Sequence, residues 1–75
     1  MAKIVISMDG GLIQFISADE PVEIYVVDYD VEGTETDDPY FTQLNGDDCL
    51  LFPWEPDINP GHVSNAIKTW KIAAK

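Results

Sequence analysis

Basic residues are scarce in this 75-residue chain, and the four lysines all lie near its two ends. All fourteen acidic residues fall within residues 4–67, an interval with no lysine or arginine, and the formal net charge is −10. Direct binding to nucleic acid or to an anionic membrane is therefore disfavoured, because no cationic side chain there can replace the counterions around phosphates. A basic protein surface, a cation or a high-salt cytoplasm are the explanations that this charge leaves open.

Cysteine and long hydrophobic runs are scarce as well. A single cysteine, Cys49, excludes an internal disulfide framework and indicates a reducing compartment. The apolar run that begins at Ile4 is interrupted at Asp9, too early for a signal peptide or a membrane span. We therefore expect a cytoplasmic protein with one domain over residues 1–75 and a radius of gyration of about 11 Å.

The stretch from Val22 to Asp38 organises the rest of the chain. Side chains alternate across a strand, so its even-numbered positions share one face. That face is apolar at Val22, Ile24 and Val26 and then becomes acidic at Asp28, Asp30 and Glu32. The pattern predicts a strand that makes a core contact with its first half and carries a row of carboxylates on its second half.

The first 32 residues predict an antiparallel meander. Lys3–Met8 and Leu12–Ser17 alternate as strands, and Asp9-Gly10-Gly11 between them suits a tight hairpin turn. A second turn at residues 18–21 leads into the Val22 strand. Short successive connections favour the strand order 1-2-3 in a sheet over residues 3–32.

The middle of the chain is less regular. Residues 33–38 have no periodic apolar content and predict a solvated acidic loop, followed by an irregular or hairpin segment over 39–58. Pro39–Leu44 suits either a short helix or a strand that enters an Asn45-Gly46 turn. Cys49–Phe52 predicts a fourth strand that ends at Pro53, and the three prolines of residues 53–60 predict a stiff, irregular connection.

The C-terminal residues predict a helix over 60–74. Asn59 suits the N-cap and Pro60 the first helical position, and the lysines near the end favour the helix dipole. The apolar residues fall on one stripe: Val63, Ala66, Ile67, Trp70 and Ala74. The predicted class is thus α+β, a three- to four-stranded antiparallel meander with this helix packed on one face.

Signals for catalysis, cofactors and metals are weak. Cys49, Asp57 and His62 include the residue types of a thiol nucleophile site, but Cys49 lies in an apolar run typical of a core residue, and His62 is expected at the surface. Asp28, Asp30 and Glu32 before Gly33 partly match a calcium loop, yet Pro39 stands where its last ligand is required. We expect no enzyme, no cofactor and no specific metal site, with a structural or weakly calcium-binding domain as the alternative function.

The acidic surface is the main candidate site. Carboxylates at Asp28, Asp30 and Glu32 would repeat at about 6.8 Å along an extended strand, and a DNA duplex presents one negative charge per about 1.7 Å of axis. Aromatic side chains near them would add contact area. The predicted partner is a basic protein surface, such as that of a nucleic-acid-binding protein, and the site residues are Asp28, Tyr29, Asp30, Glu32, Glu35, Asp37, Asp38, Tyr40 and Trp54.

Residues 3–30 resemble the start of a set of short, acidic, uncharacterised bacterial proteins found on phages and other mobile elements. The shared pattern is a strand, a Gly-Gly turn, a second strand and a third strand that ends in Asp-x-Asp, here Gly10, Gly11, Asp28 and Asp30. The resemblance implies an accessory role, such as a nucleic-acid mimic that inhibits a host-defence protein. No known pattern matches the chain after Asp38.

Overall fold

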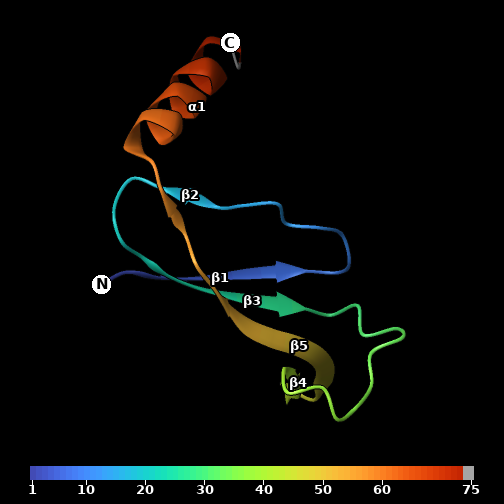
Figure 1. Ribbon diagram of the computed structural model, residues 1–75. Coiled ribbons are helices and arrows are strands. Elements are labelled where there is room, and N and C mark those ends of the chain that lie inside the picture. The colour runs from blue at the N-terminus through green and yellow to red at the C-terminus, as the bar shows by residue number, and fades with distance from the viewer. Residues whose placement is uncertain (74–75) are drawn as a thin grey trace.

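The computed structural model describes residues 1–73 as an α+β fold with one mixed four-stranded sheet and one C-terminal helix (Figure 1). In chain order the elements are β1 (Lys3–Met8), β2 (Ser17–Ala18), β3 (Glu23–Asp28), β4 (Phe41–Leu44), β5 (Asp47–Trp54), β6 (Asp57–Ile58) and α1 (Pro60–Ala73). The α+β prediction is confirmed, whereas the purely antiparallel meander is wrong.

The main sheet has the order β1-β3-β5-β4. Strands β1 and β3 pair in parallel, with Lys3 opposite Glu23 and Met8 opposite Asp28. Strand β5 then pairs antiparallel with both β3 and β4. Parallel neighbours require a long crossover, and residues 9–22 supply it here.

The predicted strand over Leu12–Ser17 is wrong. Its first five residues belong to the crossover, and only Ser17–Ala18 form a strand, β2, which pairs in parallel with β6 in a separate small sheet. The alternation of apolar residues gave the strand signal, yet Leu12 and Phe15 are exposed. Half-buried Ile13 and Ile16 take part of the apolar content inward.

For residues 39–44 the sequence allowed a short helix or a strand, and the structure forms a strand there, β4, in a hairpin with β5. Asn45 and Gly46 both have positive φ, 54° and 87°, the backbone that a type I′ turn requires. Strand β5 was expected to end at Pro53, but it runs to Trp54. The N–H of Leu51 points to the β4 side and donates to the Tyr40 carbonyl, just before β4 begins. The nitrogen of Pro53, two residues further, faces the same side beyond the β4 pairing, so Pro53 removes no ladder hydrogen bond.

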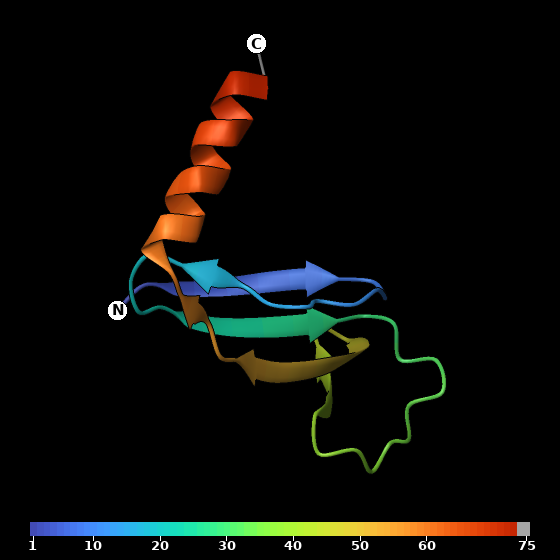
Figure 2. The ribbon, with the colours of Figure 1, turned by 45° about the horizontal axis from the view of Figure 1, so that its top comes forward.

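Helix α1 begins where predicted but does not cover the sheet. The Asn59 side chain accepts the His62 N–H at 3.0 Å as an N-cap, and Pro60 occupies the first position. Ala74, the last residue of the predicted stripe, lies outside the described residues. Among the described elements α1 contacts only β2, and it projects away from the sheet (Figures 1 and 2).

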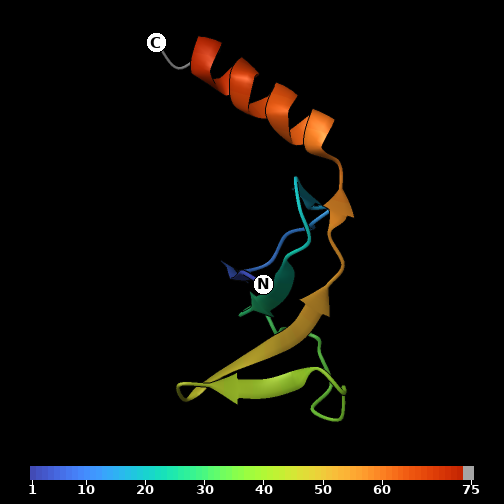
Figure 3. The same ribbon diagram turned by 90° about the vertical axis from the view of Figure 1, so that its left-hand side faces the viewer.

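The molecule is therefore longer than a compact chain of this size. Its radius of gyration is 15.3 Å, against the expected value of about 11 Å. Figure 3 shows α1 at one end and the β4–β5 hairpin at the other. Within residues 1–73, no helix has the length and apolar character needed to cross a membrane.

The core lies at the centre of the sheet, on both of its faces. Among the described residues, the buried hydrophobic side chains are Ile24, Val26, Val27 and Cys49. The strand registers place Ile24 and Val26 on one face and Val27 and Cys49 on the other. Ile24 and Val26 are thus core residues, as predicted, although the helix expected to cover them does not.

Candidate protein-binding surface

The acidic segment, which we define as residues 28–38, begins with a carboxylate that fastens two parts of the backbone. Asp28 ends β3 and is half-buried. Its Oδ1 accepts the backbone N–H of Gly10 and that of Asp30, each at 3.0 Å. Asp28 therefore joins the turn after β1 to the end of β3, and its role is structural as much as electrostatic.

The predicted straight row of carboxylates is wrong, because β3 ends at Asp28. The chain turns after it: Asp30 Oδ1 accepts the Glu32 N–H at 3.3 Å, which repeats the Asp28–Asp30 contact two residues on. Consecutive bonds of this kind bend the backbone away from an extended path. Asp30 and Glu32 are exposed, but they lie on a turn and not at the spacing of a strand.

The remainder of the acidic segment is a loop with defined turns. Thr34 N–H donates to the Val31 carbonyl at 2.9 Å and Asp38 N–H to the Glu35 carbonyl at 3.1 Å. Asp38 Oδ1 accepts the Tyr40 N–H at 2.8 Å, just before β4. These contacts fix the backbone and leave the Glu35 and Asp37 side chains exposed.

Aromatic rings follow the acidic segment at the β4–β5 side. Tyr40, 51% exposed, lies 5.8 Å from Phe52 between ring centroids, and Phe52 lies 6.4 Å from Trp54. Tyr40 and Trp54, both predicted as site residues, are thus joined through Phe52. Tyr29 is held elsewhere, since its backbone N–H donates to the Met8 carbonyl at 2.9 Å.

The structure separates Cys49 and His62, two of the residues considered for a thiol nucleophile site. Cys49 is buried in β5 near the hairpin, whereas exposed His62 lies in the first turn of α1, at the other end of the molecule (Figures 1 and 3). The His62 ring is 6.0 Å from that of Phe15. Among residues 1–73, no three His, Cys, Asp or Glu side chains come together to hold a metal ion, so the weak calcium candidate gains no support.

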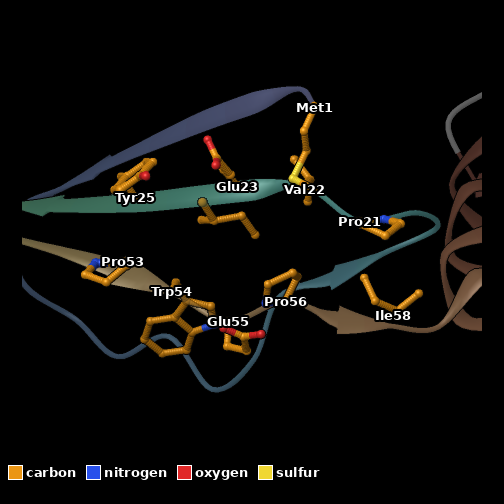
Figure 4. Close-up of a pocket in the computed structure, with 11 residues that line it drawn as sticks. Met1, Pro21, Val22, Glu23, Tyr25, Pro53, Trp54, Glu55, Pro56 and Ile58 are labelled. Carbon is orange, nitrogen blue, oxygen red and sulfur yellow. The ribbon is translucent and has the colours of Figure 1, made fainter.

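Sequence reasoning missed a groove at the start of β3 and the end of β5, of about 340 Å³. Figure 4 shows Tyr25, Pro53 and Pro56 along it, with the carboxylates of Glu23 and Glu55 beside them. The concentration of prolines at positions 21, 53 and 56 was the available signal, because proline at a strand end leaves an edge without ladder partners.

Comparison with protein-family models, with curated proteins and with solved structures gives no match to this chain. The four positions of the resemblance nevertheless form one cluster. The Gly10 N–H is bonded to Asp28, and a Cβ added at Gly10 would lie 3.0 Å from Asp30 Oδ2. The neighbouring Gly11 also has a positive φ, 93°, so the pattern describes a single turn docked on the end of β3.

Proposed function

We propose that this chain is a non-enzymatic binding protein that presents its acidic segment to a basic surface of a partner protein. The observation that carries the proposal is the combination of a fixed backbone with uncompensated charge. Asp28, Asp30 and Asp38 use one carboxylate oxygen each to hold turns, while Glu35 and Asp37 are exposed. No lysine or arginine occurs in residues 4–67 to neutralise them.

A pre-organised acidic surface suits electrostatic capture of a partner. A fixed backbone loses little conformational entropy on binding, and a field of one sign accelerates encounter with the opposite sign. Tyr40, which directly follows Pro39 at the end of the loop, supplies contact area that charges alone lack, and Phe52 connects it to Trp54 opposite the start of β3. The partner is therefore expected to carry lysines and arginines around an apolar or aromatic centre.

In its most specific form, the proposal is nucleic-acid mimicry. Proteins that grip nucleic acid carry basic grooves matched to phosphates, and the acidic segment competes for such a groove. The likeness of residues 3–30 to proteins of phages and mobile elements supports an inhibitor of a nucleic-acid-handling host-defence protein. A cytoplasmic location is part of the proposal, supported by the single buried cysteine.

Displacement of a short labelled DNA duplex from a lysine-rich histone, used as a generic basic probe, tests the proposal. The double variant Glu35→Gln, Asp37→Asn removes two exposed charges, each of which contributes up to about 1 kcal/mol to binding. The concentration for half-displacement should rise by about tenfold. The matched control, Asp19→Asn with Glu20→Gln, removes equal charge from an exposed turn outside the segment. Equal effects of both pairs would refute a localised binding surface.

A further inference from the structure

Beyond half-buried Val63, the apolar stripe of α1 is exposed in the part of the chain that the structure describes. No side chain of the helix is buried. Ile67 and Trp70, one turn apart on the same side, are 49% and 69% exposed. An amphipathic helix gains most of its stability by burying such a stripe, so the isolated chain leaves this source of stability unused.

The molecule exposes more surface than a compact chain of its size, and the excess is large enough for an interface with a partner. A compact chain of 8.4 kDa is expected to expose about 4,600 Å², and this one exposes 5783 Å². The difference, about 1,200 Å², exceeds the roughly 800 Å² that each partner buries in a standard interface. The surface needed for a stable dimer is thus available without rearrangement of the sheet.

The helix cannot fold back onto its own sheet without breaking other contacts. Only Asn59 separates β6 from α1, and its N–H donates to the Ala18 carbonyl at 2.9 Å. Strand β6 is paired with β2, and Pro60 has a fixed φ. The direction of α1 is therefore set by the β2–β6 pair, and that direction leads away from the sheet (Figure 2).

The groove at the start of β3 and the end of β5, called here the β3–β5 groove, is complementary to this helix in apolar surface and in charge. Its apolar wall includes Tyr25 and Pro53, which are neighbours across the two strands and are both exposed. Glu23 and Glu55 add two carboxylates (Figure 4). The described part of α1 carries Lys68 and Lys71 and no acidic residue.

We propose that the chain forms a symmetric dimer in which α1 of each copy lies in the β3–β5 groove of the other. Ile67 and Trp70 then cover the apolar wall, while Lys68 and Lys71 face Glu23 and Glu55. The exchange is reciprocal, so a twofold axis closes the assembly at two copies. Trp54 lines this groove and also belongs to the proposed partner surface, whereas Glu35 and Asp37 take no part in the dimer. The charge-removal test of the basic partner and the dimer test can therefore fail separately.

Sedimentation equilibrium of the full chain tests the dimer through one matched pair of variants. Trp70 and Thr69 are both exposed, but Thr69 points to the side of α1 away from Ile67 and Lys71. Trp70→Glu should raise the dimer dissociation constant by about thirtyfold or more, which corresponds to about 2 kcal/mol, whereas Thr69→Glu should leave it within about threefold. A monomeric wild type, or equal effects of the two variants, would overturn the proposal.

Charge reversal identifies the surface that α1 contacts. Glu23→Lys with Glu55→Lys, and separately Lys68→Glu with Lys71→Glu, should each give a monomer, because both create like-charge interfaces. Mixed together, the two double variants should form a heterodimer, since both of its interfaces again pair opposite charges. If the Glu23/Glu55 variant stays dimeric, α1 binds elsewhere, for example to α1 of the other copy, and the groove assignment is wrong.

Discussion

The Gly10 backbone N–H donates to Asp28 Oδ1 at 3.0 Å, across eighteen positions of the chain. This bond connects the end of β1 to the end of β3, the two strands that pair in parallel. The same oxygen accepts the Asp30 N–H and starts the turn that opens the acidic segment. One carboxylate thus couples the topology of the sheet to the surface that we propose binds a partner.

Replacing Asp28 with alanine should lower the free energy of unfolding by about 1–3 kcal/mol, because the partly buried N–H of Gly10 and the exposed N–H of Asp30 lose their acceptor. Urea unfolding at one fixed protein concentration measures the change. Asp37→Ala removes an equal charge at an exposed loop position and should stay within about 0.5 kcal/mol of wild type. Equal losses in both variants would assign the effect to net charge.

Gly10→Ala and Gly33→Ala separate backbone strain from a steric clash. Both glycines have positive φ, 82° and 79°, so both substitutions carry a left-handed strain of about 1 kcal/mol. A Cβ at Gly10 would also lie 3.0 Å from Asp30 Oδ2, whereas a Cβ at Gly33 would have no neighbouring atom within 4 Å. Gly10→Ala should therefore be the more destabilising in thermal unfolding, and the reverse order would contradict the docked turn.

Local signals in the sequence predicted several elements correctly. Strand β1 has its predicted bounds, the Cys49–Phe52 strand lies within β5, and α1 starts at Pro60 after its Asn59 cap. Each of these depends on residues close together in the chain: an alternating run, an apolar run or a capping side chain. Such signals are strong because the geometry they require is itself local.

Pairing was not predictable in the same way. The Asp9-Gly10-Gly11 sequence is typical of a hairpin, but in the structure this turn is bonded to Asp28, and residues 11–16 form no strand that pairs with β1. Whether β1 pairs with the following segment or with β3 depends on contacts distant in sequence. For the site, the exposed positions Glu35 and Asp37 were predicted, whereas the straight row through Asp30 was not, because Asx turns replaced the strand.

Replacing Asn59 with alanine should destabilise α1, because the His62 N–H loses its capping acceptor. A loss of about 1 kcal/mol is typical of such a cap, and far-UV circular dichroism during thermal unfolding should report reduced helix content. Asn65→Ala, at an exposed position inside α1, should instead raise helix content slightly through the higher propensity of alanine. A helix indifferent to Asn59→Ala would show that the cap contributes nothing.

The Cys49 thiol should react with an aromatic disulfide reagent only when the chain opens. It is 0% exposed and packs in β5 between β3 and β4. Protection should follow the free energy of unfolding as urea is raised, and a core variant such as Val26→Ala, which leaves a cavity, should speed labelling in proportion to its destabilisation. Rapid labelling of the folded chain would contradict a buried cysteine and reopen a chemical role for the thiol.

The proposed capture of a basic partner by the acidic segment is tested most directly by its salt dependence. Displacement of labelled duplex from a lysine-rich histone should be measured from low ionic strength to about 0.15 M and beyond, where screening shortens the reach of exposed charges to about 8 Å or less. Because the salt also weakens the histone–duplex complex, direct histone binding to the wild type and to the Glu35→Gln, Asp37→Asn variant must be measured in parallel. We predict that wild-type affinity falls steeply with salt and that the variant shows a shallower slope. An affinity that does not change with ionic strength would contradict the electrostatic account.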